Sequence, residues 1–228
     1  MKDGTSRASV CAVSWSGGKD SALALYAARK SGMDVTTFIS MMAPGMVTVS
    51  NGIPEAIVKA QARAAGARLL AGDPVDWNGY EPEFRRLMAC AARGGISGCV
   101  FGDIDIAGHR DWGRRMCAEA GMEAHHPLWG MSHDGAVREF ISLGFEAFIV
   151  AVDLSKMDEG WLGKRLDERA VDDIAALGLS VAGEFGEYHT LVADGPIFSE
   201  SLVPLWNACA RGVIARDGYA FIDFANTL

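Results

Sequence analysis

The 228-residue sequence is poor in several features, and each shortage excludes a class of protein. Its five cysteines are odd in number, widely spaced and without a CxxC pair, which excludes a disulfide framework, a zinc ribbon and a cysteine-ligated iron–sulfur cluster. No apolar run approaches the ~18 residues that cross a bilayer, so no membrane partner is expected. Basic residues are outnumbered, and the net charge of −8 disfavours nucleic acid as a partner.

The sequence does have the composition of a packed globular protein. Half of the residues are hydrophobic and 22% are charged, and the charges are scattered among apolar segments. Residues 1–9 are polar and lack the apolar stretch of a signal peptide. We therefore expect a soluble, cytoplasmic protein. Proline is scarce at seven residues while glycine reaches 27, so the glycines are expected in turns and close backbone contacts of an ordered fold.

Short β-branched runs alternate with segments of helical periodicity in the first half of the chain. This alternation predicts a parallel, Rossmann-like α/β sheet with helices on both faces. The predicted strands cover residues 10–15, 35–40, 68–71 and 98–102, and the predicted helices cover 20–31, 54–65, 79–93 and 109–120.

The pattern becomes less regular after residue 127 and predicts a smaller C-terminal α+β domain. We expect one domain at 1–127 and a second at 128–228, packed closely because no linker rich in proline, glycine and serine separates them. The second domain is predicted to hold a helix at 135–143, a strand at 147–152 and a helix at 164–177. Residues 41–52 are predicted to be the most mobile loop, and their methionines could line an apolar pocket.

The most specific segment reads VSWSGGKDS at residues 13–21, between a predicted strand and a predicted helix. Two glycines let backbone amides approach an anion, and the helix presents its positive end. Hydroxyl groups and a lysine add donors, so the segment predicts a phosphate cradle built from Ser16, Gly17, Gly18, Lys19 and Ser21. Asp20 is either a Mg²⁺ contact or an acid favoured by the helix dipole, with equal weight.

The spacing differs from the Walker loop and from the GxGxxG fingerprint. The SGGKDS segment instead resembles the signature of the PP-loop ATP pyrophosphatases, which belong to the adenine nucleotide α-hydrolases. That resemblance implies ATP and Mg²⁺ as ligands. It also implies transfer of AMP to a carboxylate or carbonyl oxygen with release of pyrophosphate, followed by attack of a nitrogen or sulfur nucleophile.

Later segments resemble one branch of this group, the diphthine ammonia ligase (diphthamide synthetase) family. They occur in order and extend the resemblance over residues 10–202: FGDI at 101–104, PLW at 127–129, WLGKRLD at 161–167, GEFGEYHT at 183–190 and DGPIF at 194–198. The resemblance implies ATP-dependent amidation, in which a carboxylate on the acceptor is adenylated and then attacked by ammonia. It also implies a C-terminal domain that helps to shape the acceptor pocket.

Three positions depart from the family pattern. Phe185 replaces a glycine, His189 stands where the family has Glu, and Asn51 stands where relatives often have His. A bacterial-type branch carries a similar EYHT form, and bacteria lack diphthamide. The identity of the acceptor carboxylate, protein side chain or small molecule, is therefore left open.

Several polar residues are candidates for the catalytic or substrate site, each with a plainer alternative. Glu184 and Glu187, with His189 and Thr190 behind them, could bind Mg²⁺, ammonia or a cationic acceptor group, or a carboxylate could act as the base for ammonium. Alternatively, these polar groups simply face water.

The first domain adds candidates of the same kind. Gly102 and Asp103 follow a strand at the edge where parallel sheets bind ligands, although Asp103 could merely cap a turn. Arg110 could receive a carboxylate or phosphate, or decorate a helix, and Trp112 could stack on a ring, or belong to the core. Gln61 matches a glutamine that the family carries on this helix, so it could belong to the nucleotide pocket, or it is a solvated helix residue.

Two other functions remain as alternatives to an amide ligase. One is a PP-loop enzyme of tRNA modification or sulfur transfer, which the acidic charge and the missing CxxC pair disfavour. The other is an ATP-sensing module without turnover, although the loop keeps Lys19, Asp20 and both serines. The five histidines show no metal-binding spacing, so no tightly bound transition metal is expected. A homodimer is left open.

Overall fold

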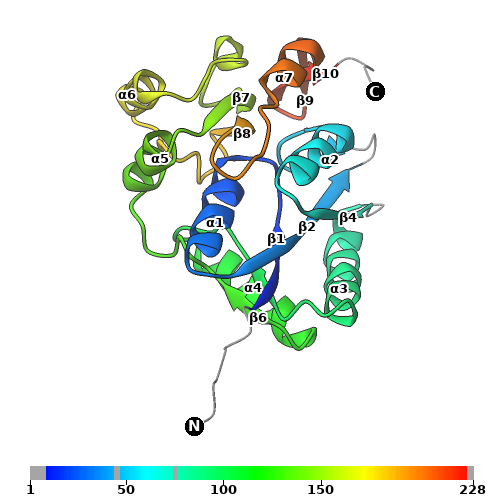
Figure 1. Cartoon of the computed structure of the whole chain (residues 1–228). Helices are drawn as coiled ribbons and strands as arrows, with labels where there is room; N and C mark the ends of the chain where they lie inside the picture. The colour runs from blue at the N-terminus through cyan, green and yellow to red at the C-terminus, as the bar shows by residue number, and fades with distance from the viewer. Residues whose placement is uncertain (1–8, 44–46, 74–75, 225–228) are drawn as a thin grey trace.

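A parallel sheet forms the first part of the chain in the computed structural model, which describes residues 9–43, 47–73 and 76–224. The strands lie in the order β4, β2, β1, β5, β6, and the short β3 pairs antiparallel with the end of β2 (Figure 1). Their bounds are β1 Val10–Ser14, β2 Asp34–Ala43, β3 Val47–Thr48, β4 Arg68–Gly72, β5 Gly98–Val100 and β6 Glu123–His125.

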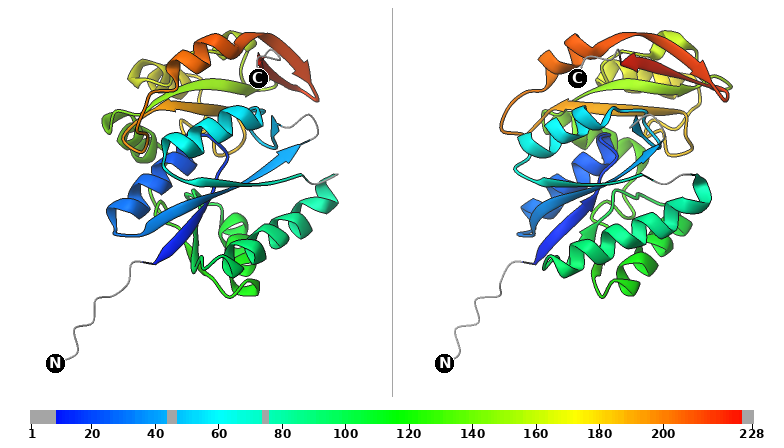
Figure 2. Two further views of the ribbon diagram at one scale, coloured as in Figure 1. Left: turned by 45° about the vertical axis from the view of Figure 1, so that its right-hand side comes forward. Right: turned by 90° about the vertical axis from the view of Figure 1, so that its right-hand side faces the viewer.

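Helices cover both faces of this sheet because successive residues of each strand point to opposite sides. Cys11 and Val13 of β1 join the core on the side of α1 and α2, whereas Ala12 joins the core on the side of α3 and α4. Figure 2 shows the two helical layers on either side of the sheet. The helices are α1 Lys19–Lys30, α2 Glu55–Ala64, α3 Trp77–Arg93 and α4 Ala107–Glu119.

A second, antiparallel sheet packs on the outer side of α1 and α2, in the strand order β8, β7, β10, β9 (Figure 2). Its strands are β7 Glu146–Asp153, β8 Tyr188–Asp194, β9 Ala210–Arg216 and β10 Tyr219–Phe224. The remaining helices are α5 His133–Ser142, the short 3₁₀ helix η1 Glu159–Trp161, α6 Glu168–Ala176 and α7 Val203–Cys209. One hydrophobic cluster includes Val13 of β1, Leu25 of α1 and Val192 of β8, so the two parts share a core.

The structure confirms the predicted Rossmann-like α/β sheet with a smaller second unit, and it corrects two local predictions. The helix predicted at 164–177 begins only at Glu168, because Asp167 caps it by accepting a hydrogen bond from the Ala170 amide. The loop predicted at 41–52 is partly strand, since 41–43 belong to β2 and Val47–Thr48 form β3; residues 44–46 lie outside the described residues. The expected division at 127/128 stays a prediction.

Within the described ranges, no helix combines the length and the apolar character needed to cross a bilayer. Cys11 and Cys99 are fully buried, as expected for small hydrophobic residues.

Candidate functional site

The SGGKDS loop joins the carboxyl end of β1 to the first turn of α1. Gly17 has φ +85°, a left-handed conformation that favours glycine, and a Cβ there would lie 2.8 Å from Ile53 Cδ1. The Gly17 carbonyl accepts two hydrogen bonds, from Gln61 Nε2 at 3.1 Å and from the Val192 amide at 2.9 Å. Because Val192 belongs to β8, the second sheet directly fixes the shape of the loop.

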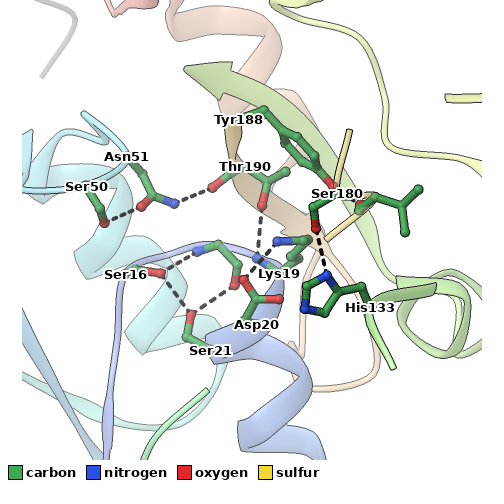
Figure 3. Close-up of polar contacts among 12 residues, drawn as sticks. Ser16, Lys19, Asp20, Ser21, Ser50, Asn51, His133, Ser180, Tyr188 and Thr190 are labelled. Carbon is green, nitrogen blue, oxygen red and sulfur yellow. Dashed lines mark hydrogen bonds and ion pairs between the residues drawn. The ribbon is translucent and has the colours of Figure 1, made fainter. Parts of the chain in front are cut away.

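Hydroxyl groups close the loop from within. Ser21 Oγ donates to the Gly18 carbonyl at 2.9 Å, and Ser16 Oγ accepts from the Gly18 amide at 3.3 Å (Figure 3). The Lys19 amide donates to Thr190 Oγ1 at 3.0 Å. The N-cap residue of α1 is Gly18, which has no side chain to cap the helix, so the positive end of α1 faces the loop.

Lys19 and Asp20 place opposite charges at this helix end. Lys19 Nζ lies 2.9 Å from Asp20 Oδ2 and 5.3 Å from the centre of the Tyr188 ring. Burial opposes the charge of Lys19, but the neighbouring negative charge of Asp20 prevails and raises the pKa of Lys19 above its ordinary value. Lys19 is therefore a buried, permanently protonated donor.

Asp20 fits the requirements of a Mg²⁺ contact. Its side chain is 34% exposed and lines the cavity in front of the loop, so its carboxylate oxygens are accessible. Among the described residues, no group of three or more His, Cys, Asp or Glu side chains could hold a metal ion by itself. A Mg²⁺ ion would thus take its other ligands from phosphates and water, which is how this ion commonly binds.

The loop opens into a cavity of about 270 Å³ between the two sheets. Gly183 and Glu184 of the turn before β8, and Tyr188, His189 and Thr190 of β8, complete its wall. The structure brings most of the predicted site residues together here: Ser16, Gly18, Lys19, Asp20, Ser21, Gly102, Asp103, Glu184, His189 and Thr190.

Two of these residues carry shifted pKa values. Burial, together with the negative charge of Asp20, raises the pKa of Glu184 to about 7. Burial, together with the positive charge of Lys19, lowers the pKa of His189 to about 4. At neutral pH the cavity therefore holds a carboxyl group close to its titration midpoint and an uncharged imidazole.

Gly102 lies at the end of β5, directly below the first turn of α1. A Cβ at this position would lie 2.8 Å from the Asp20 carbonyl carbon and 3.0 Å from the Ser21 nitrogen. The adjacent Asp103 carboxylate lies 3.2 Å from Nδ1 of the buried His126 and 3.8 Å from Nδ1 of His109. The Asp103 carboxylate therefore faces two histidine rings, which differs from the turn-capping role that the sequence left open.

The chain was compared with families and individual proteins of known function. A family model described as the diphthamide synthase N-terminal domain matches residues 9–124, and one described as the diphthamide synthase C-terminal domain matches residues 132–208. The chain belongs to the diphthamide synthase family. The resemblance noted from the motifs is thereby confirmed.

Individual relatives are more distant. A diphthine–ammonia ligase from Homo sapiens is 29% identical over 92 residues, which cover 39% of this chain and 34% of the relative. Proteins of the same name from Rattus norvegicus and Mus musculus are 30% and 29% identical and are covered over 34% and 42% of their length. The match thus spans less than half of these ligases.

Two residues that family membership assigned to the site lie outside the cavity. Gln61 is fully buried rather than solvated: its Oε1 accepts from Trp15 Nε1 at 2.9 Å, and its Nε2 donates to the carbonyls of Gly17 and Val192. Glu187 is 3% exposed, and its carboxylate accepts from the Phe185 amide at 3.0 Å and the Ser180 amide at 3.3 Å. Gln61 braces the loop and Glu187 braces the turn that carries Glu184.

Arg110 and Trp112 also lie outside this cavity. The Arg110 guanidinium stacks over the Trp129 ring at 4.3 Å, and Trp112 Nε1 donates to Glu81 Oε2 at 3.1 Å. Trp112 packs 4.8 Å from the Phe84 ring in the core beneath α3 and α4. The predicted substrate roles of both residues are not supported by their positions.

Sequence reasoning gave no site role to Asn51 and Tyr188, which line the cavity. Asn51 is buried and its Nδ2 donates to the Thr190 carbonyl at 2.7 Å, whereas the Tyr188 hydroxyl donates to the Val181 carbonyl at 2.6 Å (Figure 3). The departure of Asn51 from the diphthamide synthase pattern was the one available signal. Tyr188 belongs to the GEFGEYHT segment but was given no role of its own.

Proposed function

We propose that this chain is an ATP-dependent amide ligase that forms AMP and pyrophosphate. A carboxylate oxygen of the acceptor would bond to the α-phosphorus of ATP as the bond to pyrophosphate breaks. Ammonia would then attack the acyl carbon, AMP would leave with the bonding electrons, and the nitrogen would lose its extra proton. One observation carries the proposal: the donors of the loop after β1 line the same cavity as Glu184 and His189 at the start of β8.

The loop suits the pyrophosphate end of this reaction. Negative charge grows on the departing pyrophosphate, and it would be met by loop amides, the end of α1 and the protonated Lys19. These donors are held in place before any ligand arrives, because Gln61, Thr190 and Val192 fix the loop. A Mg²⁺ ion held at Asp20 would supply further charge neutralisation.

Glu184 is suited to the second step of the reaction, in which ammonia forms the amide. A general base works best when its pKa lies near the working pH, and the pKa of Glu184 is about 7. Ammonium must lose a proton before it can attack. We assign that proton to the Glu184 carboxylate, in place of the earlier hypothesis that Glu187 could take it.

The proposed nucleophile follows the relatives, whose name, diphthine–ammonia ligase, states a diphthine acceptor and ammonia. Only the carboxylate chemistry and ammonia are proposed for this chain, because His189 changes the acceptor side of the cavity.

The test is a product analysis. The purified protein would be mixed with ATP, Mg²⁺, isotope-labelled ammonium and a cell extract as the source of acceptors, in protein-free and protein fractions. We expect AMP and pyrophosphate in equal amounts, with label entering an amide. Formation of ADP and phosphate would contradict adenylation, and ATP binding without any product would favour the sensing module.

Lys19→Ala supplies the matched variant, with Lys30→Ala at the exposed far end of the same helix as its control. Removing a preorganised donor to a developing charge lowers the reaction rate about 10²–10³-fold, so the turnover rate of Lys19→Ala should be lower than that of the wild type by this factor. Lys30→Ala should retain its turnover. Equal turnover of the two variants would refute the phosphate cradle.

A further inference from the structure

A second cavity of about 720 Å³ adjoins the cavity in front of the loop. The β9–β10 hairpin supplies one side of it, and four residues line both cavities: Val49, Ser50, Tyr80 and His189. Its volume lies in the range of small-molecule sites, about 300–1,000 Å³. The shared residues place the two cavities side by side.

The wall of this second cavity is largely flat and aromatic. Tyr219 and Phe221 project from β10 with ring centres 6.1 Å apart, and Tyr80 contributes a further ring. The planar Arg216 guanidinium stacks over the Phe221 ring at 4.8 Å and adds a second flat group to this wall. Aromatic faces and a stacked guanidinium bind best to another flat group.

The charges around the second cavity do not favour a charged ligand body. Arg216 and Asp217 are neighbours at the hairpin turn, where their opposite charges offset each other. The Asp76 carboxylate caps the N-terminus of α3, where it accepts a hydrogen bond from the Gly79 amide at 2.9 Å. The remaining lining is apolar or uncharged at neutral pH.

His189 stands at the junction of the two cavities. Its ring makes no hydrogen bond among the described residues, and its lowered pKa keeps it neutral at pH 7. A glutamate, the family residue at this position, would be anionic, so the imidazole makes this part of the cavity less negative. A neutral imidazole admits a carboxylate and can donate a hydrogen bond to it.

We infer that the second cavity binds the acceptor, and that the acceptor is a small carboxylic acid with a flat, uncharged ring body whose carboxyl group lies at His189. The chemistry assigned to that carboxyl group rests on the proposed function, but the binding does not. Arg216, Tyr219 and Phe221 of this wall lie beyond residue 208, where the match to the family ends, so this part of the argument comes from the chain's own hairpin.

Binding can be tested without ATP, by titration calorimetry of the full chain with naphthoate, naphthamide and hexanoate. We expect naphthoate to bind at least about tenfold more tightly than the flexible hexanoate, since stacking on the aromatic wall is lost for the latter. Equal affinities for the two acids would overturn the inference.

Variants then place the ligand. Phe221→Ala should weaken naphthoate binding about tenfold and leave ATP affinity unchanged. Phe224→Ala on the same strand is the control, because its ring packs edge-on against Trp206. An equal loss in both variants would attribute the effect to the hairpin's stability, and a loss of ATP affinity in Phe221→Ala would assign the cavity to the nucleotide. Either result would overturn the inference.

His189→Glu tests the position of the carboxyl group. This variant should bind naphthoate about tenfold more weakly than the wild type and bind naphthamide with unchanged affinity, because only the acid is repelled by the new negative charge. Equal effects on both probes would overturn the assignment of the carboxyl group to His189. If these binding results hold and no AMP forms with any acceptor, the proposed function fails while the site stands. If AMP forms but naphthoate does not bind, the inference fails by itself.

Discussion

Glu184 and His189 lie five positions apart and have pKa values shifted in opposite directions. Burial, with the charge of Asp20, raises the pKa of Glu184 to about 7, and burial, with the charge of Lys19, lowers the pKa of His189 to about 4. The second sheet thus presents one group that can take a proton at neutral pH and one that stays neutral. Neither shift could be read from the sequence, because each depends on Lys19 or Asp20 of the distant α1.

The Glu184 shift makes a pH prediction with a definite sign. A folded-state pKa of about 7 against 4.5 means that the native protein binds the extra proton between these values. The stability that Glu184 contributes is present below pH 4.5 and is lost as the pH rises to 7. The Tm of the wild type should therefore fall relative to that of Glu184→Gln as the pH rises from 4.5 to 7, because glutamine keeps the uncharged form throughout; calorimetry measures both.

His189→Asn serves as the opposite case in the same experiment. Because the folded-state pKa is about 4 against 6.5, the stability that His189 contributes rises as the pH increases from 4 to 6.5. A Tm difference that changes in the same direction for both variants would contradict the assignments.

Gln61 shows what a fully buried amide can hold together. It joins Trp15 Nε1, the Gly17 carbonyl and the Val192 carbonyl in one set of hydrogen bonds. Gly17 and Val192 are 44 and 131 positions away, which is why the sequence suggested a solvated or a nucleotide-contacting residue instead.

We expect Gln61→Met to lower the free energy of unfolding by roughly 2–5 kcal/mol, since Trp15 Nε1 and the Val192 carbonyl lose the hydrogen bonds that Gln61 makes to them and the Gly17 carbonyl keeps only the Val192 amide. Lys59→Met is the control, because the 60% exposed Lys59 lies on the same helix and makes only a surface ion pair with Glu55. That variant should stay within about 0.5 kcal/mol of wild type. Urea unfolding measures both, and equal losses would contradict the bracing role.

At the scale of elements, the residues that follow β5 pack against the first turn of α1. Gly102→Ala would place a methyl group 2.8 Å from the backbone of Asp20, so the first turn of α1 must move. We expect a loss of roughly 1–3 kcal/mol of stability and weaker ATP binding, measured by unfolding and by nucleotide titration.

Gly108→Ala near the start of α4 is the matched substitution, since nothing lies within 4 Å of its added Cβ. It should keep or raise the stability, because alanine favours a helix over glycine by up to about 1 kcal/mol. A Gly102→Ala protein that matches Gly108→Ala in both measurements would show that the close contact between β5 and α1 does not shape the loop.

The sequence predicted the elements with clear periodicity and missed those without it. The alternation of strands and helices up to residue 120 predicted the first sheet. The SGGKDS loop predicted a phosphate cradle at the carboxyl end of its first strand. Strand β8 was hidden beside a glycine-rich stretch, and β9 and β10 lie beyond the last motif. Their pairings join distant segments, so no local pattern could reveal the second cavity.

At the scale of the whole molecule, one core joins the two sheets through α1. Val13, Leu25 and Val192 belong to the same buried cluster, so neither sheet can open without exposing part of the other's packing. We expect the amides of β1 and β8 to exchange hydrogen with the same free energy, equal to that of global unfolding. Native-state hydrogen exchange measures this, and an earlier opening of β8 alone would argue against a shared core.

The bond from the Lys19 amide to Thr190 has a consequence for synthesis on the ribosome. The two residues are 171 positions apart, so the anion-binding loop emerges from the exit tunnel long before the strand that fixes it. Until β8 has emerged, the nascent chain contains the SGGKDS segment but lacks the hydrogen bond to Thr190 that holds the loop in its folded shape. A nucleotide bound as proposed would therefore stabilise the finished fold and not the early intermediates of cotranslational folding.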